Sequence, residues 1–202
     1  MDNHYFSQTP QAASSPKPFD TVYKGVRYRF VTDAGVFSKG EMDKGTLTLL
    51  SAAPERMEGT LLDLGCGWGA VGVTLGKLHP ALQVTMADIN ERAIALAADN
   101  ARANGVKADT ILSDGFDKIP GQFDYILLNP PIRAGKQVVY RLFDGCRQHL
   151  APEGSLYVVI RKQQGADSAQ KYLATLFKEV TIRQRNAGFR VFECKKGRSN
   201  DV

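Results

Sequence analysis

The stretch that decides the fold is LLDLGCGWG, residues 61–69. Its first four residues are typical of a short buried strand, and its glycines predict a tight turn that opens a helix ending near residue 79. Glycine has no Cβ, so the backbone can turn sharply there and approach a ligand closely. Because ligands of parallel sheets bind beyond the carboxyl ends of the strands, this loop is a candidate binding site.

Outward from this stretch, strand and helix patterns alternate along the chain. Asn90 is a typical helix cap and Gly105 a typical helix stop. The alternation predicts an α/β fold: a mainly parallel sheet with helices on both faces, to which a C-terminal hairpin adds antiparallel strands. We expect strands over 60–64, 83–87, 109–112, 125–128, 156–160, 180–185 and 189–194, and further helices over 44–53, 90–104, 138–150 and 168–177.

The length and composition suit a single globular domain. The chain has 202 residues, of which 43% are hydrophobic and 23% charged, enough for its own core. Residues 1–18 carry Pro, Ser and Gln and predict a disordered tail. We expect one domain over 19–197, with an N-terminal hairpin at 19–37, and a short tail at 198–202.

Several classes of protein are excluded by the same sequence. No apolar run approaches the roughly 18–20 residues that a membrane helix needs, and the N-terminus lacks the apolar core of a signal peptide. Cys66, Cys146 and Cys194 are too few and too scattered for a disulfide framework or a metal cluster. We therefore expect a cytoplasmic protein with no metal site and no membrane partner.

Positive charge gathers near the C-terminus. The formal net charge is +5, and residues 161–198 hold ten basic and three acidic side chains. Such an asymmetry fits a footprint for a polyanion, and it fits a solvated basic surface that aids solubility. On charge alone, the solvated basic surface is the favoured interpretation.

Three acids follow successive strands near the glycine loop. Asp63 lies two residues before the first glycine, Asp88 ends the next strand, and Asp114 ends the third. The glycines satisfy the dinucleotide pattern G-x-G-x-x-G/A, but an acid at Asp63 suits an ammonium group better than a pyrophosphate. S-adenosylmethionine has that ammonium group, a sulfonium and a ribose, whose two hydroxyls Asp88 can hold. Asp114 can accept from the adenine amino group, although an Asp also commonly starts a loop.

The motif NPPI, residues 129–132, follows the fourth strand at the same sheet edge. Asn-Pro is also an ordinary turn former. An exocyclic or amide NH2 is a poor nucleophile because its lone pair is delocalised. The Asn129 side-chain oxygen and the Pro130 carbonyl can accept its two hydrogens, which aims the lone pair at a methyl group. Two prolines stiffen the loop, and rigid acceptors suit orientational and electrostatic catalysis.

These motifs resemble class I S-adenosylmethionine-dependent methyltransferases. More narrowly they are similar to the methyltransferase small domain group, which includes small-subunit ribosomal RNA guanine-N2 methyltransferases. The resemblance implies a Rossmann-like, doubly wound sheet of seven strands whose last strand is inserted antiparallel. It covers about residues 20–196 and rests on residues 35–38, 43–46, 63–69, 88, 114 and 129–132.

The motifs and the resemblance together assign the candidate site. The resemblance implies that residues 43–46 help to close the cofactor site. The expected cofactor is S-adenosyl-L-methionine, bound by Thr46, Asp63, Gly65, Cys66, Gly67, Asp88, Ile89, Asp114, Gly115 and Asn129. The expected catalytic residues are Asn129, Pro130, Pro131 and Ile132.

Two departures from the group concern the substrate. Ile132 stands where many amine methyltransferases have Tyr or Phe to stack on the target base. The best-known bacterial guanine-N2 members also carry a second, degenerate domain for substrate binding, for which this chain has no room. Both departures bear on the target nucleotide and leave methyl transfer itself untouched.

The leading hypothesis is an N-methyltransferase of ribosomal RNA that acts on the exocyclic N2 amine of a guanine in small-subunit (16S) RNA. Methylation of a protein glutamine amide and a non-catalytic RNA-binding scaffold remain as alternatives, and a dehydrogenase does not account for the Asn-Pro-Pro loop. The expected partner is RNA, contacted by Arg183, Arg185 and Arg190 and by the hairpin residues Arg27, Tyr28 and Arg29.

Overall fold

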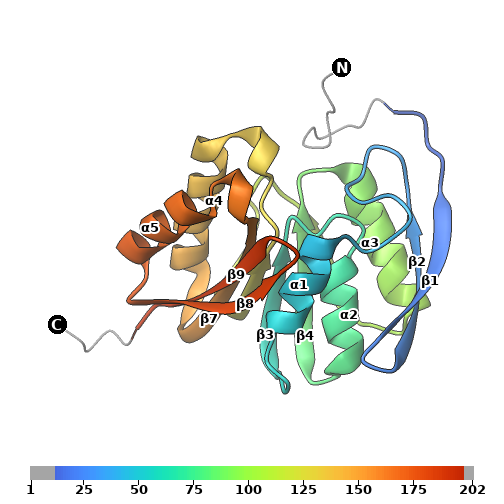
Figure 1. Ribbon diagram of the computed structural model, residues 1–202. Helices are drawn as coiled ribbons and strands as arrows, with labels where there is room; N and C mark the ends of the chain where they lie inside the picture. Colours follow the sequence, from blue (N-terminus) through green and yellow to red (C-terminus); the bar gives the residue numbers. More distant parts are fainter. Residues whose placement is uncertain (1–11, 198–202) are drawn as a thin grey trace.

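A mixed sheet forms the middle layer of the protein in the computed structural model, which describes residues 12–197 (Figure 1). Its seven strands follow the order β5-β4-β3-β6-β7-β9-β8. The five strands from β5 to β7 run parallel, and β9 pairs antiparallel with both β7 and β8. The predicted doubly wound sheet with its C-terminal antiparallel hairpin is therefore confirmed. The strands are β3 (Gly59–Leu64), β4 (Leu82–Asp88), β5 (Ala108–Leu112), β6 (Phe123–Leu128), β7 (Leu150–Arg161), β8 (Glu179–Asn186) and β9 (Phe189–Lys195).

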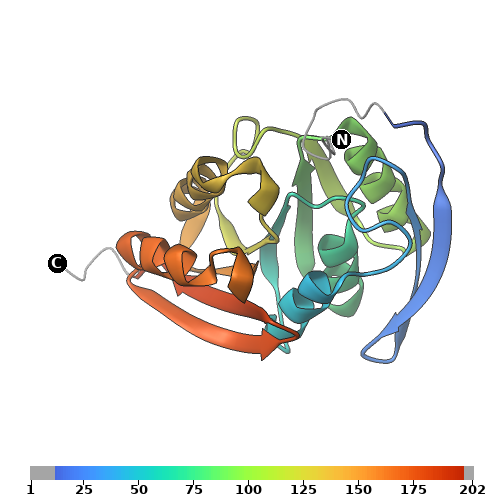
Figure 2. The same ribbon diagram turned by 45° about the horizontal axis from the view of Figure 1, so that its top comes forward.

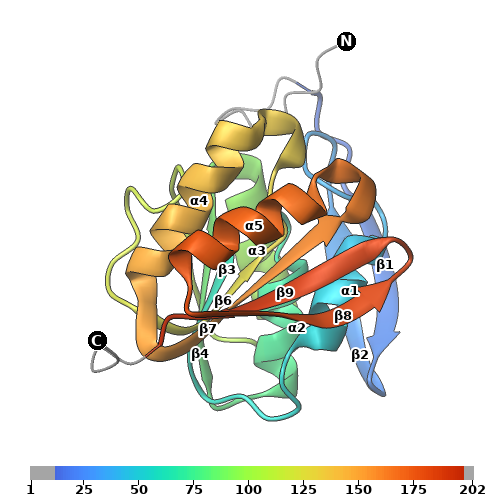
Figure 3. The same cartoon turned by 60° about the vertical axis from the view of Figure 1, so that its left-hand side comes forward.

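Helices cover both faces of this sheet. The α1 to α3 helices share one hydrophobic core with one face, and α4 and α5 share a second core with the other, as Figure 3 shows for α4 and α5. Successive residues of β3 alternate between the cores, because Leu61 joins the first and Leu62 joins the second. The helices are α1 (Lys44–Ala52), α2 (Ala70–Leu78), α3 (Glu91–Ala103), α4 (Lys136–His149) and α5 (Ala166–Leu176), with short 3-10 turns η1 (Ile132–Ala134) and η2 (Lys162–Gln164).

A separate two-stranded sheet, β1 (Lys17–Tyr23) and β2 (Val26–Thr32), lies outside α3 at the opposite end of the molecule from β8 (Figure 1). The expected boundary between tail and hairpin, after residue 18, is too late, because Pro18 already pairs with Val31. Proline fits this position because an outer strand has a free edge that needs no N–H donor. The rest of the expected tails, residues 1–11 and 198–202, lies outside the described residues.

Two buried asparagines, Asn100 of α3 and Asn104 at its C-cap, attach this hairpin to the domain. The Asn100 side chain donates to the Val31 carbonyl and accepts from its N–H, at 2.9 and 2.8 Å. Asn104 makes the same pair of bonds with Arg29, at 2.8 and 3.1 Å. These side chains satisfy the free edge of β2, so the hairpin is fixed to α3 by polar as well as apolar contacts.

Tyr28 corrects the expected RNA contacts. The sequence predicts that Tyr28 contacts RNA, but its side chain is 2% exposed and stacks on Phe30 with ring centroids 5.9 Å apart. Its hydroxyl donates to the Thr74 carbonyl at 3.2 Å. Tyr28 points inward because alternate residues of β2 face α2 and α3, so it belongs to the core and cannot reach a nucleic acid.

The parallel strands end at a common edge, which is tilted toward the viewer in Figure 2. The glycine loop follows β3, Asp88 ends β4, residues 113–115 follow β5, and the Asn-Pro-Pro loop follows β6. The topology thus brings every predicted motif to one end of the sheet. In the described part of the chain, no helix is both long and apolar enough to cross a membrane.

Candidate active site

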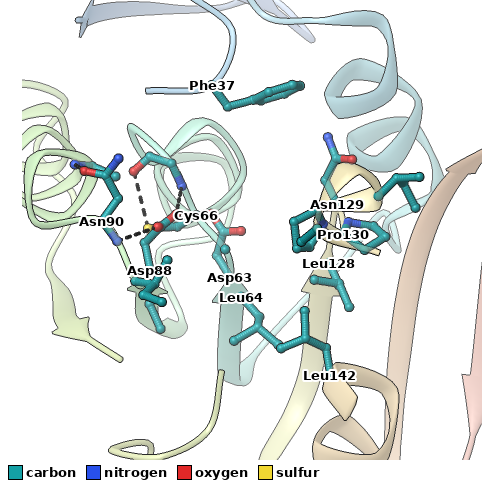
Figure 4. A pocket seen from close by; sticks show the side chains of 18 of the residues that line it. Phe37, Asp63, Leu64, Cys66, Asp88, Asn90, Leu128, Asn129, Pro130 and Leu142 are labelled. Carbon is teal, nitrogen blue, oxygen red and sulfur yellow. Dashed lines mark hydrogen bonds between the residues drawn. The ribbon is translucent and has the colours of Figure 1, made fainter. Parts of the chain in front are cut away.

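A cavity of about 720 Å³ opens at this edge of the sheet (Figure 4). Its volume lies in the range of small-molecule binding sites. Asp88 and Asn90 form one wall, Asn129 and Pro130 the opposite wall, and Asp63 lies between them. Every residue predicted for the site lines this one cavity: Thr46, Asp63, Gly65, Cys66, Gly67, Asp88, Ile89, Asp114, Gly115, Asn129, Pro130, Pro131 and Ile132.

The glycine loop bends back over the end of β4. The N–H groups of Gly65 and Cys66 both donate to the Ala87 carbonyl, at 2.8 and 2.9 Å. Gly65 and Gly67 have φ angles of 69° and 54°, which residues other than glycine rarely adopt. A Cβ at Gly65 would meet no protein atom within 4 Å, so it would occupy the cavity itself. The missing side chain therefore leaves room for a ligand against the backbone.

Asp88 joins the glycine loop to the start of α3. Its two carboxylate oxygens accept from the N–H groups of Gly67 and Asn90, at 2.8 and 2.9 Å. Burial raises the pKa of Asp88, although these N–H groups act in the opposite direction. The carboxylate is therefore held in a fixed orientation on the cavity wall.

Asp63 is a buried acid at the floor of the cavity. Its side chain is 3% exposed and accepts from the Gly72 N–H at 2.8 Å. Burial raises the pKa of Asp63 to about 7, and the nearby Asp88 charge adds to this effect. A carboxyl group with such a pKa is poorly solvated when ionised. A cationic ligand would supply the missing partner.

The loop after β5 places Asp114 on the rim. Its carboxylate accepts from Arg141 of α4 at 2.6 Å, and both side chains are about half exposed. Ion pairs of this kind contribute little to stability, typically about 0–1 kcal/mol. Asp114 and Gly115 both line the cavity.

The Asn-Pro-Pro loop forms a tight turn. Pro131 has φ −75° and ψ 74°, and the Ile132 N–H donates to the Pro130 carbonyl at 2.8 Å. This is the geometry of an inverse γ-turn. A carbonyl oxygen has two lone pairs, so Pro130 can still accept a second hydrogen. The turn and the ring of each proline hold this acceptor beside the Asn129 side chain.

Residues 33–43 close the cavity from the side of β2. The Trp68 indole N–H donates to the carbonyls of Phe37 and Ser38, at 3.0 and 3.1 Å. Asp43 caps α1 by accepting from the Gly45 and Thr46 N–H groups, and the Thr46 hydroxyl also donates to it. Thr46 therefore lies at the cavity with its hydroxyl engaged by Asp43.

Several lining residues were not predicted from the sequence. Arg161 ends β7 beside β6, a position that the expected strand at 156–160 indicates. Arg133 directly follows the Asn-Pro-Pro-Ile motif, so proximity along the chain could have found it. Phe37 falls at the end of the expected hairpin at 19–37, and the alternation there does not indicate that it reaches the cavity. The cavity is also lined by Arg141, Gln164 and Phe189.

Comparison with known proteins agrees with the geometry. The family model described as the methyltransferase small domain matches residues 27–193. The chain belongs to this methyltransferase family. Family membership confirms the resemblance carried by the glycine loop, the strand-end acids and the Asn-Pro-Pro loop.

Relatives of this methyltransferase are found in several bacteria. The protein YbxB of Bacillus subtilis is 39% identical over 200 residues, which are 97% of this chain and 100% of that protein. A protein named ribosomal RNA small subunit methyltransferase C, from Aeromonas hydrophila, is 36% identical over 168 residues, 80% of this chain and 47% of that one. The chain thus spans about half the length of the ribosomal RNA methyltransferases that it matches.

Solved structures share the fold. The 16S rRNA N2 methyltransferase RsmC of T. thermophilus, solved with AdoMet and guanosine, superposes with a TM-score of 0.82 and 25% identity, covering 93% of this chain and 52% of that one. A ribosomal protein L11 methylase from Lactobacillus delbrueckii has a TM-score of 0.66 at 19% identity, covering 80% and 81% of the two chains, a likeness of fold.

The cofactor of this methyltransferase is S-adenosylmethionine, the compound named AdoMet in the T. thermophilus structure. The cavity fits it chemically. Asp63 and Asp88 offer two carboxylates to a molecule with an ammonium, a sulfonium and a ribose, and Gly65 leaves open space against the backbone. When bound, the cofactor supplies an electrophilic methyl group on a sulfonium.

Proposed function

We propose that this methyltransferase acts on ribosomal RNA and methylates the exocyclic N2 amine of a guanine in the small-subunit RNA. The observation that carries the proposal is the rigid pair of acceptors, Asn129 and the Pro130 carbonyl, on the wall opposite Asp88. Two supporting comparisons are the relatives named for small-subunit ribosomal RNA and the structural neighbour solved with guanosine.

The cofactor is held, in this proposal, by the carboxylates and the backbone of the glycine loop. Asp88 accepts hydrogen bonds from both ribose hydroxyls of the cofactor, and Asp63 lies toward its ammonium group. Asp114 accepts from the adenine amino group. The backbone of Gly65, Cys66, Gly67, Ile89 and Gly115 completes the site, with Thr46 supporting it through Asp43.

Asn129 and Pro130 prepare the target amine for attack. The Asn129 side-chain oxygen accepts one amine hydrogen and the Pro130 carbonyl accepts the other. The two bonds favour a pyramidal nitrogen whose lone pair points into the cavity. They strengthen as the nitrogen becomes positive in the transition state, which is where stabilisation accelerates a reaction. Water can take the proton afterwards, so the site needs no strong base.

A labelling experiment tests this function. The protein is incubated with methyl-labelled S-adenosylmethionine and with fractionated cellular RNA and protein, and the labelled product is digested and mapped. We expect N2-methylguanosine from small-subunit RNA. Label on a glutamine amide would support the alternative substrate with the same NH2 chemistry, and label on another base would contradict the guanine target.

The RNA surface is expected at the cavity rim. Arg133 and Arg161 line the cavity and are exposed, whereas Arg183 and Arg190 of the predicted basic surface form ion pairs with Glu193 and Asp167. Phosphate binding by exposed cations releases counterions and depends steeply on salt.

In a double variant, Gln replaces both Arg133 and Arg161. We expect weaker RNA binding, and we expect the slope of log affinity against log salt concentration to fall by about two, one for each phosphate contact. Filter binding of unmethylated small-subunit RNA between 50 and 200 mM salt measures both. The matched variant replaces Arg27 and Arg29, the two hairpin residues that the sequence also predicts to contact RNA, with Gln on β2. If the RNA binds only at the cavity rim, the slope of this variant should stay unchanged. An unchanged slope in the rim variant would place the RNA elsewhere.

Cofactor affinity is expected to depend on pH through Asp63. The ionised carboxylate attracts the ligand's positive charge, so protonation of Asp63, with its pKa of about 7, competes with binding. The affinity should fall as the pH falls, by roughly 20-fold between pH 7.5 and pH 5.5. Isothermal titration with S-adenosylmethionine measures this dependence. Asp63→Asn should bind more weakly and show no such step; a step that persists would belong to another group.

A further inference from the structure

Phe37 is an exposed aromatic side chain at the cavity. Among residues 12–197, the exposed large hydrophobic side chains are Val22, Phe37 and Leu47, with 63%, 50% and 38% of their surface accessible. Phe37 lines the cavity, whereas Val22 lies on β1 and Leu47 on α1. An exposed aromatic ring in a cavity wall is a typical ligand contact, because covering its apolar surface with a ligand removes that surface from water and lowers the free energy.

The backbone of Phe37 is anchored. Its carbonyl accepts from the indole of Trp68, which is 2% exposed, and the neighbouring Val36 is buried. Before Phe37, the Asn90 side chain donates to the Gly35 carbonyl at 2.9 Å, and after it the Trp68 indole also donates to the Ser38 carbonyl at 3.1 Å. The ring is thus carried on a segment fixed from both sides, so little backbone order has to be gained when a ligand binds.

The Phe37 ring borders the open space shared by the reacting groups. Figure 4 shows it above Asp63, with the Asn129 amide also bordering this space. A base whose amine reaches the Asn129 oxygen and the Pro130 carbonyl would lie within the same space. Phe37 is therefore placed to cover one face of that base.

The other candidates for stacking are occupied. Ile132 is half-buried against the core of α4 and α5, and it offers no aromatic face. Trp68 is buried, and the Phe189 ring has the Arg161 guanidinium 5.9 Å from its centroid. Among the aromatic residues that line the cavity in the described chain, Phe37 alone is exposed.

We propose that Phe37 stacks on the target base and orients its amine toward Asn129 and Pro130. Phe37 thereby supplies the stacking ring that many amine methyltransferases have at the position of Ile132. This inference rests on the proposed function, because the base is taken to be guanine. Stacking on an aromatic ring tolerates many bases, so Phe37 positions the base while the Asn129 and Pro130 acceptors require an amine.

The test compares Phe37→Ala, Phe37→Leu and Phe37→Tyr in the full chain saturated with S-adenosylhomocysteine, using guanosine as the probe. Base–aromatic stacking corresponds to roughly a five- to 150-fold loss of guanosine affinity in Phe37→Ala. Phe37→Leu keeps apolar area but should recover only part of the loss, and Phe37→Tyr should bind like the unsubstituted protein. The upfield ring-current shift of guanosine H8 should disappear with alanine and return with tyrosine.

Two controls separate stacking from other effects. The affinity for S-adenosylhomocysteine should change by less than about twofold, a change under 0.5 kcal/mol. Val22→Ala, which removes an exposed apolar side chain outside the cavity, should leave guanosine binding unchanged. The melting temperature of each variant is measured to show that the fold persists.

The inference is overturned if Phe37→Ala binds guanosine as the unsubstituted protein does. It is also overturned if S-adenosylhomocysteine affinity falls as much as guanosine affinity, because the ring then packs on the cofactor. The proposed function fails by a different result. In that case the unsubstituted protein places the methyl label on a residue other than guanine when the labelled RNA is mapped. If Phe37→Ala makes N2-methylguanosine as well as the unsubstituted protein does, the stacking role of Phe37 is rejected and the proposed function stands.

Discussion

Replacing Asn129 with alanine is expected to slow methyl transfer by about 10²–10³-fold, the typical effect of removing one transition-state hydrogen bond. The substitution removes one of the two acceptors and keeps both prolines, so the γ-turn at Pro131 persists. The effect falls on kcat, because the lost bond strengthens only as positive charge develops on nitrogen. A single-turnover assay with saturating S-adenosylmethionine and RNA measures the rate.

Asn129→Asp is the matched variant. It keeps an acceptor oxygen and adds a negative charge, so it should retain more activity than alanine. S-adenosylmethionine affinity should change much less than the rate in both variants. Methyl transfer by Asn129→Ala at the unsubstituted rate would reduce the Asn-Pro-Pro loop to an ordinary turn and remove the main support for amine chemistry.

Replacing Asp88 with alanine is expected to weaken S-adenosylmethionine binding by roughly ten- to a thousand-fold. A single charge-assisted bond to a ribose hydroxyl contributes about 1.5–3 kcal/mol, or roughly 10- to 150-fold in affinity, and the second bond extends this range upward. Asp88 also accepts from the N–H groups of Gly67 and Asn90, so the substitution frees the glycine loop from the start of α3. Titration calorimetry measures the affinity.

Asp88→Asn separates these two contributions. Its amide oxygen can still accept one N–H bond, but it carries no charge and its NH2 group cannot accept from a hydroxyl. We expect an affinity and a urea unfolding midpoint that both lie between those of the unsubstituted protein and of Asp88→Ala. Unchanged affinity in Asp88→Ala would remove Asp88 from the cofactor site.

The sheet was predictable because its local patterns agree with one another. A helix cap at Asn90, a stop at Gly105 and a turn at 186–188 each mark a boundary that the structure keeps. The strand at 156–160 was predicted too short, because β7 begins at Leu150, directly after α4, and pairs there with Phe123. That pairing is long-range, and no local pattern in residues 150–155 indicates it.

The cavity was predictable where chemistry follows a strand end. The acids and the Asn-Pro-Pro loop were found because parallel strands end at one edge, which gathers residues distant along the chain. Phe37 and Tyr28 show the limit of this reasoning. Both fall within the expected hairpin at 19–37, but β2 ends at Thr32, so Phe37 lies beyond the strand and is exposed at the cavity, whereas Tyr28 is buried against α2. Long-range contacts decide which ring faces the solvent: Tyr28 bonds to Thr74 of α2, and the Phe37 backbone bonds to Trp68.

The insertion of β9 between β7 and β8 sets the order in which the sheet can be completed. The strand β8 is bonded to β9 and not to β7, so it has no place in the sheet until β9, which follows it along the chain, has docked. Until then β7 presents an open edge whose residues 156–160 are all buried in the finished protein. Such an edge can pair with another chain. In the finished sheet β9 covers this edge along its whole length from Ser155 to Arg161, so the inserted strand also protects β7 from pairing with another chain.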